Sequence, residues 1–553
     1  MSLVVSSVVH RPQTVSPGHA FTSCLRASVP SCLCLALLLA ASTVSATDWP
    51  CWGGRDDRNT VSDEKNLPDS FDPGQKRATS VGIDLATTKN VRWTARLGGA
   101  AYGNPTVAGG RVFVGTDDKL IDEDPRFTRS KAGMLLCLDE KTGELLWQLV
   151  TPRRSAPWPN SLFTHQDLGT CSSPAVDGDR VYIVSTACEV LCLDVRGQAH
   201  GNEGPFTDEG KYMAGPGNPP IKLTPKDADI IWKYDLIDEL GVRPHDAASC
   251  SVLIHGDVLY VGTSNGVDKG HEKMPAPDAP AFIALDKRTG RLLAKENVRL
   301  SAHQFHCQWS SPSLGKVGDK TLVFLGGGDG VCYAFEALAS VPEKPVDLKN
   351  VWSYDCNPPS YKLRDGKPIR YTDGDKRKSR SPNKNDGLYI GPSDIIATPV
   401  FHNGRIYVAT GQDPAHGRGK GMLSCIDATK SGDITGTGKI WSYDAIDRTI
   451  ADATVADGLV YIPDIAGRMH CLDADTGKVQ WVFESGAETW GGVLVAEGKI
   501  YWANTKEAFV MATGREIKIL SRVKLPSPAY STPIVANGTI YLASQKYLWA
   551  IGK

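Results

Sequence analysis

The sequence predicts an all-β fold, an eight-bladed β-propeller built from four-stranded antiparallel blades. A two-strand pattern with a Gly, Asp or Asn turn occurs eight times, and a second pattern of Asp, tight turn and Trp often follows it. The last copies are spaced by 40 residues, and four short antiparallel strands over about 40 residues form one propeller blade. Glycine (55) and proline (35) are abundant, as expected for a protein with many turns.

The first two strands of each blade are predicted from an apolar alternation, a short turn and a second strand that carries an aromatic residue. Clear copies are TPVFHNGRIYVAT at 398 and TPIVANGTIYLAS at 532. Period-two alternation on both sides of a Gly- or Asn-containing turn is the pattern of a β-hairpin. The second-strand aromatic residues of the eight copies are Phe113, Tyr182, Tyr260, Phe324, Tyr407, Tyr461, Tyr501 and Tyr541.

The third and fourth strands are predicted from segments such as LLCLDEKTGELLWQL at 135–149 and MHCLDADTGKVQWVF at 469–483. The Asp opens the turn by bonding its own backbone, and the Gly supplies a positive φ. One third-strand position holds a small residue, and we interpret the cysteines there as apolar packing residues. These residues are Cys137, Cys192, Cys425 and Cys471, with Ala284, Ala334 and Ala550 in other blades.

An orphan strand near the N-terminus is predicted to close the ring. The last copy contains three strands, whereas NVRWTARLG precedes the first copy, and its Trp93 stands where other blades have a fourth-strand Trp. We therefore expect residues 90–97 to form the outer strand of the last blade, which removes the free sheet edges. The matching fourth-strand residues are Trp147, Trp232, Trp352, Trp441 and Trp481.

The N-terminal segment is predicted to be a targeting signal. Residues 31–42 form an apolar stretch of about a dozen residues, which is too short to span a bilayer comfortably and is preceded by Arg and His but by no acid. We expect a signal peptide at 1–46, an N-terminal extension at 47–89 and the propeller at 90–553. A misplaced start codon or a retained anchor are the alternatives. The expected location is secreted or periplasmic, with no transmembrane segment after leader removal.

The overall charge excludes one class of partner. The chain carries 61 basic and 62 acidic residues, a formal net charge of −1. No global field would therefore draw it onto nucleic acid. The expected partner is a protein, a small molecule or a glycan.

Two motifs resemble a known family. The pattern ALD-xx-TG-xxxW after the hairpin is similar to that of quinoprotein-dehydrogenase-like propellers, also called PQQ-like repeat proteins. The opening DWPCWGGRDDRN…LP at 48–68 resembles secreted members found in planctomycete-type bacteria. The resemblance implies the propeller fold. It leaves function open, because the family includes calcium- and PQQ-dependent dehydrogenases and also non-catalytic members that assist outer-membrane assembly.

Candidate site residues lie just before each first strand, where we expect them to face the central channel. Long insertions at 117–133, 151–170, 266–280, 355–394 and 412–421 fall mostly on this same face, while 195–228 decorates the other. Carboxylates, imidazoles and aromatic planes could hold a ligand there or form an ordinary polar plug. The residues are Tyr102, His165, Asp167, His245, Asp246, His306, Trp309, Asp394, Asp452, Glu488, Trp490 and Tyr530.

Cofactor binding is tested against the family pattern. PQQ alcohol dehydrogenases carry two adjacent cysteines over the cofactor, whereas this sequence has no Cys-Cys pair and no CxxCH haem motif. PQQ and Ca²⁺ therefore remain implied by the resemblance alone. The densest group of potential metal ligands is His303, His306 and Cys307, which precede a strand without a second cluster to complete four ligands.

The preferred hypothesis is an extracytoplasmic binding or interaction scaffold whose ligand lies on the face with the long loops. A PQQ- or metal-dependent oxidoreductase of the cell envelope is the first alternative. A propeller that binds or processes polysaccharide is the second, suggested by the aromatic and acidic residues at the channel mouth.

Overall fold

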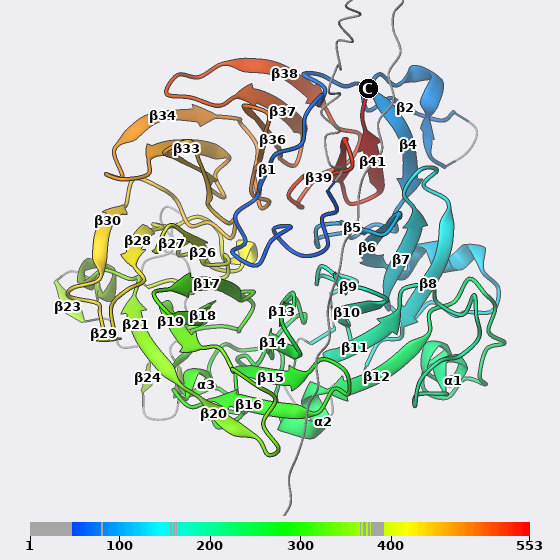
Figure 1. Ribbon diagram of the computed structural model, residues 1–553, viewed down its shortest axis with the longest axis horizontal. Coiled ribbons are helices and arrows are strands. Elements are labelled where there is room, and N and C mark those ends of the chain that lie inside the picture. The colour runs from blue at the N-terminus through cyan, green and yellow to red at the C-terminus, as the bar shows by residue number, and fades with distance from the viewer. Residues whose placement is uncertain are drawn as a thin grey trace, which may run out of the picture. The chain divides into compact units, whose positions relative to one another are not determined.

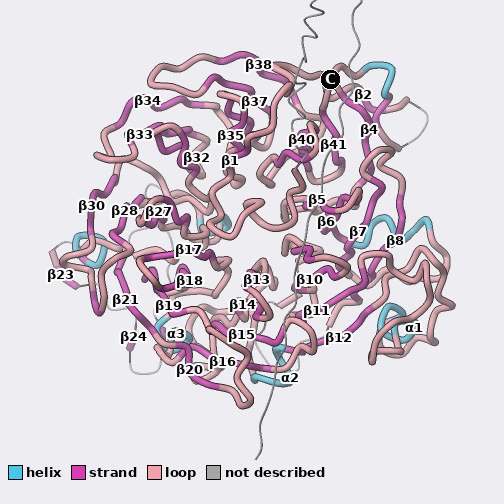
Figure 2. The backbone as a smooth tube through the Cα atoms, viewed as in Figure 1, coloured by secondary structure: helices cyan, strands magenta, loops and turns pink. Residues whose placement is uncertain are grey.

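The computed structural model describes residues 47–78, 81–154, 158, 161, 163–164, 166–364, 366–368, 372–373, 376–377 and 392–553. These residues belong to one compact unit, Ser45–Lys553. Within it, eight four-stranded antiparallel sheets follow one another around a ring, which confirms the predicted propeller (Figure 1). Strands and loops dominate the backbone of this unit (Figure 2).

Each blade is a meander whose first strand lies nearest the centre of the ring and whose fourth strand lies at the rim (Figure 1). Blade 1 comprises β5 (Thr106–Ala108), β6 (Arg111–Asp117), β7 (Gly133–Asp139) and β8 (Leu145–Thr151). Blade 2 comprises β9 (Ala175–Asp177), β10 (Arg180–Val184), β11 (Glu189–Asp194) and β12 (Ile230–Asp235). Blade 3 comprises β13 (Leu253–His255), β14 (Val258–Gly262), β15 (Phe282–Asp286) and β16 (Leu292–Glu296). Blade 4 comprises β17 (Ser313–Val317), β18 (Lys320–Gly326), β19 (Val331–Glu336) and β21 (Asn350–Asp355).

The second half of the ring has the same plan and, in blades 6 to 8, the shortest loops. Blade 5 comprises β26 (Val400–His402), β27 (Arg405–Ala409), β28 (Leu423–Asp427) and β30 (Lys439–Tyr443). Blade 6 comprises β31 (Thr454–Ala456), β32 (Leu459–Pro463), β33 (Arg468–Asp473) and β34 (Val479–Glu484). Blade 7 comprises β35 (Leu494–Ala496), β36 (Lys499–Ala503), β37 (Glu507–Ala512) and β38 (Ile519–Lys524). Blade 8 comprises β39 (Ile534–Ala536), β40 (Thr539–Ala543), β41 (Tyr547–Ile551) and β4 (Val91–Arg96).

Short elements outside this plan decorate the ring. Three two- or three-residue strands add to blade edges in parallel: β1 (Val61–Ser62) to β35, β20 (Val346–Leu348) to β16 and β29 (Gly432–Asp433) to β21. Small hairpins are formed by β2 (Gln75–Lys76) with β3 (Ile83–Asp84), β22 (Leu363–Arg364) with β23 (Lys367–Pro368) and β24 (Thr372–Asp373) with β25 (Lys376–Arg377). The helices are α1 (Glu209–Ala214), α2 (Leu236–Leu240) and α3 (Leu300–His303), with 3-10 turns at Leu85–Thr87, Asp118–Glu123, Pro359–Lys362 and Pro414–His416. None of the helices in the described part of the chain has both the length and the apolar character needed to cross a membrane.

Strand β4 closes the ring as predicted. It pairs antiparallel with β41, and Trp93 lies opposite Ala550, which in turn lies opposite Tyr541 of β40. The same row of aromatic, small residue and Trp recurs in other blades, for example Phe113, Cys137 and Trp147. The two outer rings of a row lie 5.9 Å apart between centroids in both of these blades. The third-strand residue must therefore be small, because the two large rings on either side pack close together over it.

Each fourth-strand Trp also joins its blade to the next one. The indole of Trp93 donates to the carbonyl of Glu140 in blade 1, at 2.8 Å, and its ring packs against Gly143 in the same turn. Gly143 has a φ of +72°, and a Cβ there would lie 2.5 Å from the Trp93 ring. The TG of the repeat thus provides the turn and the space for the neighbouring blade's Trp. Equivalent indole bonds run from Trp147 to Val195, Trp232 to Lys287, Trp352 to Ala428, Trp441 to Ala474 and Trp481 to Gly514.

The N-terminal segment 47–62 lies inside the ring and bonds to every blade, which the repeat pattern alone did not predict (Figure 1). Its backbone and side chains pair with groups on the innermost strands, which would otherwise have unpaired edges. The bonded residues, one or more per blade, are Val107, Val176, Val252, Pro312, Leu314, Phe401, Val455, Val495 and Asn537. This segment, which we call the central plug, therefore lies along the inner edges of all eight blades.

Candidate functional site

A cavity of about 210 Å³ opens at the mouth of the channel, on the face that carries the long loops between second and third strands. Six of the predicted site residues line it, and Trp52 of the central plug joins them. We call this space the mouth cavity. The six predicted residues are Tyr102, Asp246, Trp309, Asp452, Trp490 and Tyr530.

Three aromatic rings form one wall of the mouth cavity. Tyr102 and Trp490 stack at 5.6 Å between centroids with an interplanar angle of 18°, and Tyr530 lies 4.3 Å from Trp490. The indole of Trp490 donates to Glu488 Oε1 at 2.6 Å, so the predicted residue Glu488 positions the ring rather than lining the space. Aromatic rings arranged in this way offer a flat apolar surface to a bound molecule.

The carboxylates of the mouth cavity are held in apolar surroundings. Asp452 accepts hydrogen bonds from the Trp52 indole at 2.7 Å and from the Thr398 backbone at 2.6 Å. Burial raises the pKa of Asp452 to about 6. Burial and the nearby Asp413 carboxylate raise the pKa of Asp246 to about 7. These groups therefore carry protons, fully or in part, at pH values where ordinary aspartates are ionised.

Replacing Asp452 with Asn is expected to remove one component of the protein's pH-dependent stability. The raised pKa means that the folded protein keeps a proton that the unfolded chain releases between about pH 4 and pH 6. The free energy of unfolding should therefore fall as pH rises through this window, by on the order of 2 kcal/mol from this group. Denaturant titrations of both proteins from pH 4 to 7 measure the difference, and a difference that does not change with pH would refute the assignment.

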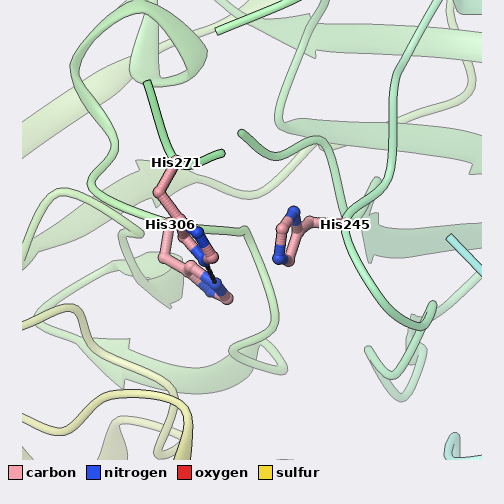
Figure 3. Close-up of side chains that lie close together, drawn as sticks. All are labelled: His245, His271 and His306. Atoms are coloured by element: carbon pink, nitrogen blue, oxygen red, sulfur yellow. Dashed lines mark hydrogen bonds between the residues drawn. The ribbon is translucent and has the colours of Figure 1, made fainter. Parts of the chain in front are cut away.

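A cluster of four imidazoles lies beside the mouth cavity. Nε2 of His306 and Nε2 of His271 are 2.9 Å apart, and the rings of His245 and His416 lie 4.5 Å and 4.9 Å from that of His306. Figure 3 shows the rings of His271 and His306 side by side, with His245 facing them. Burial and the adjacent His271 lower the pKa of His245 to about 4, so it is neutral at pH 7. His245, His271 and His306 form one group of potential metal ligands. His306, Asp413 and His416 form a second group.

Two further predicted site residues, Asp167 and Asp394, lie away from the lining of the mouth cavity. Asp167 lies 3.6 Å from Arg129 and 3.9 Å from Lys119 in an ion-pair network. Asp394 is buried, and its backbone bridges to Gly411. His165 lies outside the described residues. Neither Asp167 nor Asp394 is among the described residues that line the cavity.

Of the three residues predicted as metal ligands, His303, His306 and Cys307, one belongs to this imidazole cluster. His306 belongs to both groups of potential ligands in the described residues, whereas His303, at the end of α3, and Cys307 belong to neither. The Cys307 thiol instead donates to the Ser264 carbonyl at 3.0 Å, and burial raises its pKa well above the usual value.

The family profile described as outer membrane protein assembly factor BamB matches residues 75–203, 122–338, 369–483, 419–516 and 466–552. These matches cover most of the chain. The chain belongs to this family of PQQ-like repeat propellers. No curated protein matches it.

Three solved structures can be compared with this chain. A europium-containing methanol dehydrogenase is 13% identical with a TM-score of 0.54, over 90% of this chain and 89% of that one. BamB from Moraxella catarrhalis is 12% identical with a TM-score of 0.47, over 83% and 96% of the two chains. Quinohemoprotein alcohol dehydrogenase from Comamonas testosteroni is 14% identical with a TM-score of 0.42, over 92% and 81%. At 13% identity the likeness to the methanol dehydrogenase concerns the fold alone.

The mouth cavity of this PQQ-like repeat propeller does not fit the quinone cofactor for which the repeat is named. PQQ is a flat tricarboxylate and needs cationic or amide partners. Among the described residues that line the cavity, Asn104 and Gln166 offer two amides, but no Lys or Arg is present to balance the three carboxylates of PQQ. Asp246, Asp413 and Asp452 also line the cavity, and the fraction of them that is ionised repels a bound trianion. Ca²⁺ fits the adjacent cluster equally poorly, because Ca²⁺ takes oxygen ligands and the cluster offers mainly imidazole nitrogen.

Among the aromatic, imidazole and carboxylate residues of the mouth cavity and the imidazole cluster, four were not predicted: Trp52, His271, Asp413 and His416. The sequence signal for the last three was available, since they lie in the insertions 266–280 and 412–421 that were assigned to the decorated face. A search of those loops for imidazoles and carboxylates would have found them. Trp52 lies in the extension before the repeats, and its place in the channel follows from the tertiary structure.

Proposed function

We propose that the protein is an extracytoplasmic binding protein that holds a small, uncharged, ring-shaped molecule in the mouth cavity, and that a sugar ring is the ligand class. The lining carries the proposal, because it combines a wall of three aromatic rings with carboxylates whose raised pKa values allow them to donate as well as accept hydrogen bonds. Sugar rings stack on aromatic faces and bond through hydroxyl groups.

The central plug supports the same proposal. It lies along the inner strands of the ring, and its Trp52 contributes to the lining of the mouth cavity. Concave sites with mostly apolar walls and a few placed polar groups are typical of small-molecule binding. Residues 1–46, the predicted signal peptide, lie outside the described part of the chain. The extracytoplasmic location is therefore part of what we propose.

Calorimetry with neutral monosaccharides (glucose, galactose, mannose and xylose) tests the proposal, with PQQ as an anionic comparison. We expect at least one sugar to bind and to change tryptophan fluorescence. Replacing Trp490 with Ala should weaken that binding about tenfold, because the stacking surface is lost. Trp158, which packs against Phe163 and does not line the cavity, provides the matched control variant, Trp158→Ala.

Two outcomes contradict the proposal. One is that PQQ binds whereas all the sugars fail, and that PQQ with Ca²⁺ then supports dye reduction with an alcohol or sugar substrate. That result would favour the dehydrogenase alternative. The other is that sugar binding is equally weakened by the Trp490 and Trp158 variants, which would place the ligand elsewhere.

A further inference from the structure

We propose a site for one divalent transition-metal ion at the wall of the mouth cavity. This goes beyond the proposed function, because the ion can be bound with or without a sugar. The ligands would be imidazole nitrogens and one carboxylate from the cluster described above. They are His245, His271, His306, His416 and Asp413.

The distances between the ligand atoms are close to those around a metal ion. The atoms of His245, His271 and His306 lie within 4.8 Å of one another, as do those of His306, Asp413 and His416. An ion with bonds of about 2.0–2.1 Å keeps its ligand atoms roughly 3–4 Å apart. His306 belongs to both groups, and the ring centroids of His271 and His416 lie 5.1 Å apart, so the two groups form one cluster around the His306 ring.

A backbone contact orients one of the proposed ligands, His245. Nδ1 of the buried His245 lies 2.8 Å from the Val267 carbonyl, and this contact fixes the proton on Nδ1. Nε2 is then directed away from the backbone, and lies 3.5 Å from Asp246 Oδ2. A metal-binding imidazole usually has its second nitrogen held by a carbonyl or carboxylate in this way.

The ligands come from the segments that distinguish blades 3 to 5 from the bare repeat. His271 lies in the loop 266–280 between β14 and β15, and Asp413 and His416 lie in the loop 412–421 between β27 and β28. His245 and His306 precede the first strands of blades 3 and 4. Two insertions from blades that are not adjacent therefore converge on one point, which indicates a site rather than separate loop decorations.

The ligand set favours a particular class of ion. Imidazole nitrogen with one carboxylate suits Zn²⁺, Cu²⁺, Ni²⁺ or Fe²⁺, whereas Mg²⁺ and Ca²⁺ prefer oxygen. Asp413 also lines the mouth cavity, together with Pro414 from the same loop. An oxygen atom of a molecule in the cavity would thus lie near the ion and could complete its coordination.

The test uses the tag-free protein after treatment with a chelator and dialysis. We expect Zn²⁺ and Cu²⁺ to bind with one ion per chain, and bound Cu²⁺ to show nitrogen hyperfine splitting in its EPR spectrum. The His271→Ala variant should lower affinity by more than tenfold and the His271→Ala/His416→Ala double variant by more than about 100-fold. Both residues are only half buried, so these variants should fold, which is checked by thermal melting without metal.

The matched control is His303→Ala, since His303 is three residues from His306 but belongs to neither ligand group in the described residues. It should bind metal as the unmodified protein does. The proposal is overturned if neither ion binds more tightly than about 10 μM, if the double variant binds normally, or if the His303 variant loses binding equally. Each of these results leaves the sugar-binding test unaffected, because the calorimetry with sugars uses the same chelator-treated protein without added metal.

Discussion

The Trp93→Ala variant is expected to lose about 3–5 kcal/mol of unfolding free energy, which is the usual cost of removing a large buried aromatic side chain. Trp93 is 3% exposed and makes two kinds of contact at the joint between blades 8 and 1. Its ring fills the space between Tyr541 and Gly143, and its indole donates to the Glu140 carbonyl. Removing it leaves a cavity and a carbonyl without its donor at the point where the ring closes.

Denaturant titration and thermal melting measure this loss. The matched control is Ile519→Ala, because Ile519 also lies on an outer strand but is 41% exposed, and its removal should cost less than about 1 kcal/mol. If the Trp93 and Ile519 variants had similar stability, the joint between the first and last blades would contribute little to the fold.

The Arg58→Met variant is expected to lose about 3 kcal/mol or more. Arg58 is fully buried, and its guanidinium donates to the carbonyls of Trp52, Val252 and Pro312 at 2.6–2.9 Å. Methionine fills similar space but leaves these acceptors unpaired, and each buried unpaired group costs about 1–3 kcal/mol. Arg58 also has a φ of +63°, a conformation that persists only when surrounding contacts hold it.

The control for this prediction is Arg55→Met in the same segment. Arg55 is exposed and pairs only with Asp57 at 2.7 Å, and a surface ion pair of this kind is worth at most about 1 kcal/mol. Equal stability of the two variants would mean that the central plug does not depend on Arg58. Trp52 fluorescence gives a second measurement, because loss of the Arg58 bond should loosen the floor of the mouth cavity.

Much of the fold could be predicted because each repeat residue has a local reason for its identity. The aromatic residue of the second strand, the small residue of the third and the Trp of the fourth form one row across the sheet, so their spacing is visible in the sequence. Trp93 has the spacing of a fourth-strand Trp but lies before the first repeat. This position predicted that β4 would complete the last blade and close the ring. Blades 3 and 7 lack the Trp, with Ala294 and Ser521 at that position, yet form the same sheet.

The site was only partly predictable, since its parts follow different rules. Tyr102, Asp246, Asp452 and Trp490 precede first strands, and this repeat position directed them to the channel. His271 and His416 lie in insertions without a repeat, and no local pattern fixes where such loops run. They come together only because blades 3, 4 and 5 surround one side of the channel mouth.

The central plug also bears on the order in which the protein can fold. Residues 47–62 are made before any blade, but their partners extend from Val107 to Asn537. β4 likewise cannot pair until β41, the last strand of the chain, has been made. Contacts of such long sequence separation form slowly. During synthesis the segment from the plug to β4 therefore remains without most of its partners. The finished ring, with its mouth cavity, is assembled only when the two ends of the propeller meet.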